Sequence, residues 1–171
     1  NNPADLKSAD RIILPGGGAL GDGIEHLVSR GWVEAIRMEA IDNKIPLLGI
    51  CLGMQLLATK GFESGQHMGL DLIPGIVEKL KPAKNDEKIP HVGWNEVHYK
   101  QDNHLFNGIP DGRDFYFVHS YHFVPADPED IVGITPCCGS VVSAINRENV
   151  FGTQFHPEKS IPSGFDLIKN F

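Results

Sequence analysis

The sequence predicts an α/β fold: an open, mostly parallel sheet flanked by helices, with an added antiparallel β portion. Two short, continuous apolar runs, residues 11–14 and 46–50, each lead into a glycine-containing turn and then into helical periodicity. Continuous rather than alternating apolar runs are typical of parallel strands that are covered on both faces. After about residue 74 the pattern changes to short β-rich runs separated by Asp, Asn, Gly and Pro turns. This succession favours an α/β sheet with an extra β layer.

The elements follow in chain order. Apolar residues between Ile24 and Ile41 recur at roughly helical spacing and are interrupted near Gly31, which predicts one or two helices. Residues 52–59 predict the helix that follows the second strand. The predicted β-rich runs are residues 75–80, 94–99, 115–124, 131–135, 141–145 and 150–155. A closing helix is predicted over residues 161–171.

Composition limits the function classes. The chain has 171 residues, 41% of them hydrophobic, which suits one domain with a sizeable core. A net charge of −7 without a basic cluster disfavours nucleic acid as a partner. The sequence has neither a long apolar run nor a leader-like start, so we expect no membrane partner and a cytoplasmic location. Cys51, Cys137 and Cys138 form no disulfide or metal-binding spacing, which indicates reduced thiols.

Cys51 lies between two glycines, Gly49 and Gly53, where a strand meets a helix. The spacing matches the G-x-S-x-G elbow, in which a nucleophile occupies a strained strand-to-helix turn. Small flanking residues allow close packing, and we expect them to push the thiol into solvent. The N-terminus of the following helix is expected to lower the pKa of the thiol. The Leu52 N–H can donate to an oxyanion. The alternative is that Cys51 is a small buried residue.

A base for such a thiol is found in the C-terminal segment, where Pro157 separates His156 from Glu158. Proline biases the preceding residue toward an extended conformation, and residues two apart on an extended segment point to the same side. Glu158 can therefore hold one imidazole nitrogen while the other faces a thiol or a substrate. The alternative is a solvated turn.

A glycine-rich loop, residues 15–18, follows the first strand. It lacks the Lys-Ser/Thr of a phosphate-binding loop and the spacing of a dinucleotide-binding loop. Its glycines can expose backbone N–H groups to an oxyanion, and Gly17 or Gly18 is the candidate for a second donor. The alternative is a plain turn.

Taken in order, residues 14–23, 49–57, 91–97, 117–123 and 152–160 resemble the class I glutamine amidotransferases, most closely the glutaminase subunits of imidazole glycerol phosphate synthases. The resemblance implies a flavodoxin-like sheet and hydrolysis of L-glutamine to glutamate and ammonia through a cysteine thioester. It implies a catalytic triad of Cys51, His156 and Glu158, with the Leu52 and Gly17 N–H groups as oxyanion donors. The substrate-binding positions that it implies are Gly53, Gln55, Glu63, His119, Ser120 and Tyr121.

The resemblance also implies a partner. Ammonia would pass to a HisF-like cyclase (synthase) subunit in a heterodimer, and the family segment that meets this subunit matches His91, Trp94 and Asn95. It implies no cofactor. We expect no metal either, because His119 and His122 have no third ligand at useful spacing. Residues 1–171 would form a single amidotransferase domain that lacks the first β-α unit of the family, about 30 residues long.

Three alternatives remain open at this point. Related glutaminases serve the amination of nucleotide sugars for surface polysaccharides, and no motif separates the two destinations. The same cysteine elbow occurs in DJ-1-like redox proteins, although the His156–Glu158 pair and the spacing of Gln55 and Glu63 argue against that class. A scaffold without catalysis would not need all three triad residues.

Overall fold

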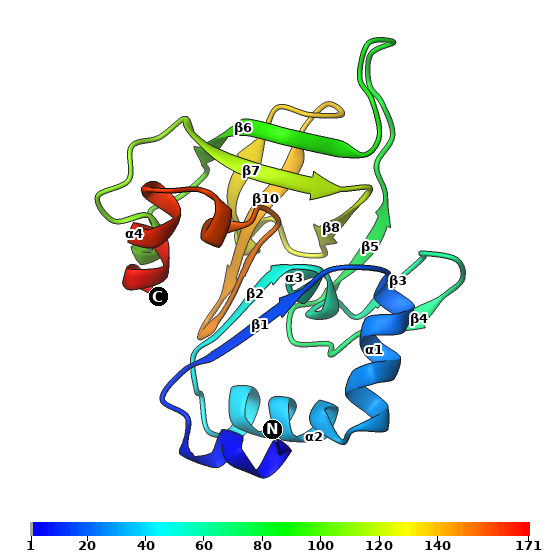
Figure 1. The fold of residues 1–171 in the computed structure, drawn as a ribbon, viewed down its shortest axis with the longest axis vertical. Coiled ribbons are helices and arrows are strands. Elements are labelled where there is room, and N and C mark those ends of the chain that lie inside the picture. The colour runs from blue at the N-terminus through cyan, green and yellow to red at the C-terminus, as the bar shows by residue number, and fades with distance from the viewer. Residues whose placement is uncertain (1) are drawn as a thin grey trace.

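Seven strands form one mixed sheet in the computed structural model, which describes residues 2–171 (Figure 1). Their order is β1-β2-β11-β10-β9-β6-β7. The strands are β1 (Ile12–Gly16), β2 (Leu47–Cys51), β6 (His91–Tyr99), β7 (Arg113–His119), β9 (Ile131–Thr135), β10 (Val141–Arg147) and β11 (Val150–Thr153). A smaller sheet has the order β4-β3-β5-β8 and contains β3 (Lys60–Gly61), β4 (His67–Met68), β5 (Gly75–Lys79) and β8 (Tyr121–Pro125).

The predicted α/β class, with its antiparallel addition, is confirmed. β2 pairs in parallel with both β1 and β11, and the remaining pairs of the large sheet are antiparallel. The antiparallel part takes a larger share of the sheet than the sequence suggested. Within it, β9, β10 and β11 follow one another through short connections, whereas the parallel neighbours β1 and β2 are joined by a crossover, the helical segment between them.

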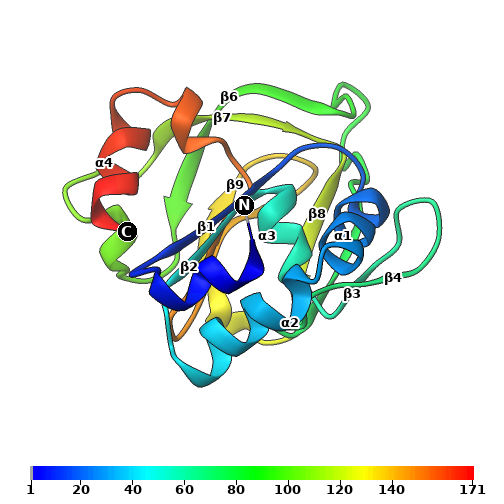
Figure 2. The ribbon, with the colours of Figure 1, turned by 60° about the horizontal axis from the view of Figure 1, so that its bottom comes forward.

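Helices cover both faces of the parallel strands. They are α1 (Leu20–Ser29), α2 (Trp32–Arg37), α3 (Leu52–Leu56) and α4 (Ser163–Asn170). Successive residues of β2 serve different cores: Leu47 packs in the cluster that includes α1 and α3, and Leu48 packs with Phe151 and Leu167 of α4. Figure 2 shows α2 and α3 on one side of β1 and β2, and α4 on the other. Both leucines are fully buried, so the strand between the two cores is rigidly held.

Three boundaries differ from the sequence prediction. The run 115–124 is not one strand but two, β7 and β8, which belong to different sheets and part at Ser120, whose carbonyl accepts the Leu80 N–H. The helix after Cys51 ends at Leu56, because the chain turns there to contact the loop at residues 70–73. The closing helix begins only at Ser163. The break at Gly31, which adopts a φ of 71°, is as predicted.

No helix within residues 2–171 has the length and apolar character needed to cross a membrane.

Candidate active site

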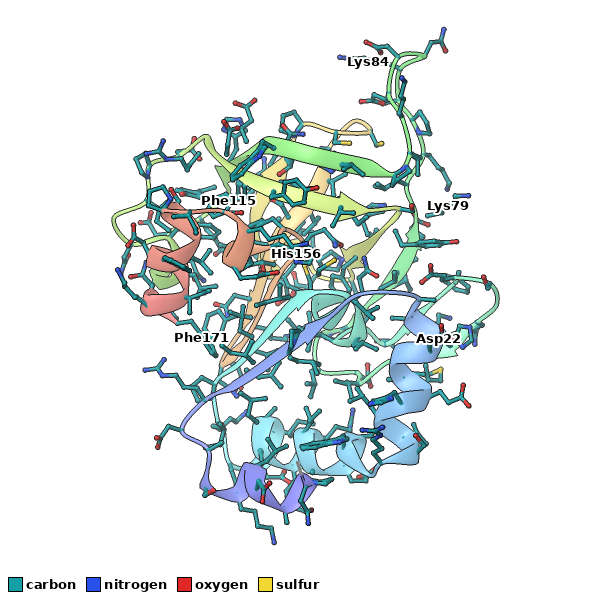
Figure 3. All side chains as sticks on the ribbon, in the orientation of Figure 1. Asp22, Lys79, Lys84, Phe115, His156 and Phe171 are labelled. Atoms are coloured by element: carbon teal, nitrogen blue, oxygen red, sulfur yellow. The ribbon has the colours of Figure 1, made fainter. Side chains whose placement is uncertain are left out.

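The carboxyl ends of three adjacent strands meet at one edge of the sheet. Register pairs Gly16 of β1 with Cys51 of β2, and Ile50 with Thr153 of β11. The residues that follow these strands therefore converge, as expected for an α/β sheet. A pocket of about 410 Å³ opens at this edge and is lined by Gly17, Cys51 and His156 among others. Figure 3 shows His156, one of these lining residues, near the middle of the molecule.

Cys51 sits in a strained turn. Its φ of 53° and ψ of −109° are rare for a residue with a side chain. The flanking glycines permit this turn, since a Cβ on Gly53 would lie 1.7 Å from the Leu14 carbonyl oxygen and one on Gly49 would lie 2.6 Å from the Gly53 carbonyl group. The predicted close packing of strand and helix is therefore confirmed. Gly53 does not line the pocket, and its packing against β1 accounts for it without a substrate contact.

Replacing Gly53 with alanine is expected to lower the free energy of unfolding by at least about 3 kcal/mol, because the new Cβ meets backbone that cannot move aside. Urea denaturation followed by circular dichroism measures the change. Gly17→Ala is the matched control, since a Cβ there meets nothing within 4 Å. Equal stability of the two variants would show that β1 and the elbow do not pack as closely as described.

The Cys51 thiol is less available than the sequence suggested. Only 7% of the residue is exposed, so the expected projection into solvent is wrong. The expected low pKa is wrong too: burial raises the pKa of this thiol, and the opposing hydrogen bond from the Leu52 N–H does not outweigh it. The helix that was to lower it, α3, has only five residues. The sulfur contacts the Val118 carbonyl oxygen at 3.9 Å and Gln154 Nε2 at 3.7 Å. A buried thiol of this kind needs a base.

His156 is held in the form that a base requires. Its Nδ1 lies 2.7 Å from Glu158 Oε1, and because a carboxylate only accepts, Nδ1 carries a proton, so that in a neutral ring Nε2 keeps its lone pair. That Nε2 atom is buried and has no hydrogen-bond partner among the described residues. The pair does not share an extended segment as expected, because a 3₁₀ turn, Pro157–Lys159, presents Glu158. Ser160 fixes this turn by donating to the His156 carbonyl at 2.7 Å.

The lining of the pocket also includes most of the implied substrate-binding positions: Gln55, Glu63, His119, Ser120 and Tyr121. Gln55 Nε2 donates both hydrogens within the protein, to the Tyr121 carbonyl and to Gln154 Oε1, each at 2.9 Å. Its carbonyl oxygen is therefore the group left for a ligand. Glu63 Oε2 accepts the Leu20 N–H at 2.7 Å, at the start of α1. A contact with glutamine stays a prediction for each of these residues.

Sequence reasoning missed Gln154, Val118 and Lys159. Gln154 is completely buried and touches the sulfur, and its signal was a lone amide in an apolar strand end, two residues before His156. Val118 acts through its backbone carbonyl, for which the sequence carries no signal. Lys159 lines the pocket and opposes the rise in the Cys51 pKa, although a lysine beside a surface turn carries no signal of its own in a sequence.

The residues expected at a partner interface divide into two groups. Trp94 is 57% exposed and lies edge-on to Tyr116 on the outer face of β6 and β7, next to the exposed Val92 and Val118. We call Val92, Trp94, Tyr116 and Val118 the apolar β6–β7 face. Asn95 is half-buried, and His91 is buried beneath this face, so its expected direct contact with a partner is not supported.

A family model, glutamine amidotransferase class-I, matches residues 1–171. The chain belongs to this family. It is 48% identical to the imidazole glycerol phosphate synthase subunit HisH of Moorella thermoacetica, over 100% of the chain and 80% of that protein. It is also 48% identical to the HisH subunit of Rhodospirillum rubrum, over 95% of the chain and 77% of that protein. Class I glutamine amidotransferases are enzymes, so the site described above belongs to an enzyme.

Solved structures share the class I fold. A putative GMP synthase subunit from Thermoplasma acidophilum superposes with a TM-score of 0.71 at 20% identity, over 99% of this chain and 74% of that one. The glutaminase domain of a Trypanosoma brucei CTPS, with bound acivicin, gives a TM-score of 0.67 at 18% identity, over 98% and 73%. At these identities the likeness establishes the amidotransferase fold and no more.

Proposed function

We propose that this chain is the glutaminase subunit of an imidazole glycerol phosphate synthase, hydrolysing L-glutamine to glutamate and ammonia in histidine biosynthesis. The observation that carries the proposal is that Cys51 and the unpaired Nε2 of His156 line one pocket. The names of the 48%-identical relatives support the choice of synthase.

The chemistry follows from the positions of the side chains. Cys51 Sγ attacks the side-chain amide carbon of glutamine while His156 Nε2 takes the thiol proton. The resulting oxyanion accepts hydrogen bonds from the Leu52 N–H and, we infer, from the Gly17 N–H. His156 returns the proton to the departing nitrogen, which leaves as ammonia. Water then attacks the thioester with His156 again as base, releasing glutamate and restoring the thiol.

The amino-acid end of glutamine would contact the polar side chains in the pocket lining. Glu63 keeps one carboxylate oxygen beyond its bond to Leu20, and this oxygen suits the α-ammonium group. The free carbonyl oxygen of Gln55 offers a second acceptor. Ser120 and Tyr121 also line the pocket, at the corner between β7 and β8.

The partner in this proposal is a HisF-like cyclase (synthase) subunit, joined to the chain as a heterodimer. The apolar β6–β7 face supports this, because an exposed tryptophan among apolar neighbours is the common anchor of a protein interface. Val118 belongs both to this face and to the pocket lining, so ammonia would leave the pocket beside the partner. We further infer that residues 1–171 act as one domain, and that the three free thiols suit the reducing cytoplasm.

Purified chain should release ammonia from glutamine faster with a HisF-like cyclase and its nucleotide substrate than alone. Trp94→Ala is expected to lower this stimulation about tenfold or more through weaker binding of the cyclase, since buried tryptophan anchors are typical hot spots. Val28→Ala, at a similarly exposed position on α1, is the control. If a synthase that aminates nucleotide sugars stimulated ammonia release and the cyclase did not, the result would favour a function in surface-polysaccharide biosynthesis. Peroxide sensitivity without ammonia release in any pairing would favour the redox alternative.

A further inference from the structure

Two buried histidines lie beside the pocket without a part in the chemistry above. His91 of β6 and His119 of β7 are register partners, and His91 Nδ1 lies 2.9 Å from His119 Nε2. Each ring has a second partner. Asn95 Nδ2 lies 3.1 Å from His91 Nε2, and His119 Nδ1 lies 2.8 Å from the Tyr121 carbonyl oxygen. All four ring nitrogens are therefore engaged.

These hydrogen bonds, which run from Asn95 through His91 and His119 to the Tyr121 carbonyl, are called here the histidine chain. Its two ends determine the position of every proton within it. The Tyr121 carbonyl can only accept, so His119 Nδ1 carries a proton and, in a neutral ring, its Nε2 accepts. His91 must then donate from Nδ1 and accept at Nε2. At the other end the Glu96 N–H donates to Asn95 Oδ1 at 2.9 Å, which turns the Asn95 NH₂ group toward His91. Both ends thus require the same direction of donation.

Both rings are suited to remain neutral. Burial lowers the pKa of His119 to about 4, and burial also lowers the pKa of His91. A proton added to either ring would place two N–H groups face to face, because each acceptor nitrogen already receives a hydrogen bond. The histidine chain is therefore stable only when both rings are neutral and in the Nδ1–H form.

The histidine chain ends at the Tyr121 carbonyl, on the wall of the pocket. The Tyr121 carbonyl that accepts from His119 also accepts from Gln55 Nε2. The second hydrogen of Gln55 goes to Gln154, whose own Nε2 points at the Cys51 sulfur. Asn95 on β6 is in this way connected through hydrogen bonds to the residues that surround a bound substrate.

We propose that His91 and His119 are positioning residues of the glutamine site: their hydrogen-bond chain fixes the Tyr121 carbonyl and, through it, the Gln55 amide. The proposal rests on the proposed function in that it takes glutamine as the ligand. It replaces the expected substrate contact of His119, whose two nitrogens are both occupied within the protein. It also gives buried His91 a role other than direct contact with a partner.

The first test reads the tautomers directly. In ¹⁵N-histidine-labelled chain, long-range ¹H–¹⁵N spectra should show the Nδ1–H form for both rings, with neither ring an imidazolium at neutral pH. Exposed His98, whose pKa is raised by its hydrogen bonds to Glu96 and Asp111, should be seen to gain a proton as the pH falls and serves as the control. An Nε2–H form at either ring, or an imidazolium at that pH, would overturn the proposal.

The second test uses kinetics with the partner present. His91→Phe preserves the stacking on Phe117, whose ring centroid lies 4.7 Å away, but removes the hydrogen bonds. KM for glutamine should rise about tenfold and kcat change less than about threefold, because the pocket wall rather than the reacting atoms is disturbed. His122→Phe replaces another largely buried histidine that is not part of the histidine chain, and it should leave KM and kcat unchanged.

A KM within twofold of wild type in a folded His91→Phe variant would also overturn the proposal. His119→Phe should raise KM at least as much. Because this variant also leaves the Tyr121 carbonyl without its His119 donor, the decision rests on His91→Phe and on the tautomers. Failure of the proposed function looks different. The wild-type chain would then release no ammonia in any pairing, and the tautomer spectra would still decide whether the chain of hydrogen bonds exists.

Discussion

Replacing Cys51 with alanine is expected to lower ammonia release from glutamine by at least about 10³-fold, because the nucleophile is the only sulfur among the described residues that line the pocket. Alanine has no atom that can form an acyl bond, and what remains is the activity contributed by binding and by the oxyanion donors. The measurement is coupled-enzyme detection of ammonia or glutamate, with the cyclase present. Alanine keeps the Cβ that the strained turn at φ 53° already accommodates, so the fold should persist.

Cys138→Ala is the matched control for this experiment. Cys138 is also a free thiol, but it lies outside the pocket lining, and its loss should leave glutamine hydrolysis within about twofold. The complex that contains Cys51→Ala should still use added ammonium salt in place of glutamine. Glutaminase activity of Cys51→Ala within tenfold of wild type would mean that another group attacks the amide.

Replacing His156 with glutamine is expected to lower kcat by about 10²- to 10⁴-fold, the usual contribution of a positioned acid and base. The loss should be large because burial raises the pKa of the Cys51 thiol, so little thiolate forms without a proton acceptor. A glutamine side chain at position 156 retains a polar group of similar reach, but it cannot take up and return the proton. Steady-state kinetics over a range of pH measure the effect.

Glu158→Gln should have a smaller effect than His156→Gln. The Glu158 side chain is 47% exposed, so water can partly replace its hydrogen bond to Nδ1, and the loss of kcat is expected to be smaller than that of His156→Gln. The order Cys51, His156, Glu158 in decreasing effect is itself a test. A Glu158 variant more damaged than the His156 variant would show that the carboxylate does more than orient the ring.

Much of the fold was predictable because its signals are local. The apolar runs of β1 and β2 and the glycine break between α1 and α2 follow from periodicity and backbone preference. The split of residues 115–124 was not predictable, because Ser120 is no helix or strand breaker and the change of sheet depends on a distant partner, Leu80. Short-range patterns do not contain such pairings.

The candidate site divides in the same way. The strained elbow and the contact between His156 and Glu158 were predictable from the sequence, although a 3₁₀ turn rather than an extended segment makes that contact, and the structure brings Cys51 and His156 to one pocket. The direction of the pKa shift of the Cys51 thiol was predicted wrongly, since burial acts against the helix N-terminus and burial depends on the whole fold. The histidine chain was not predicted at all. His91 and His119 are far apart in sequence, and only the register of β6 and β7 makes them neighbours.

The central claim is that Cys51 forms a thioester with glutamine. The most direct measurement is to quench the complex with acid during turnover of isotopically labelled glutamine and to locate the label by peptide mass spectrometry. The account predicts one γ-glutamyl group on the peptide that contains Cys51, and none in the Cys51→Ala variant. Label on the peptide with Cys137 and Cys138, or turnover without any protein-bound label on Cys51, would contradict it.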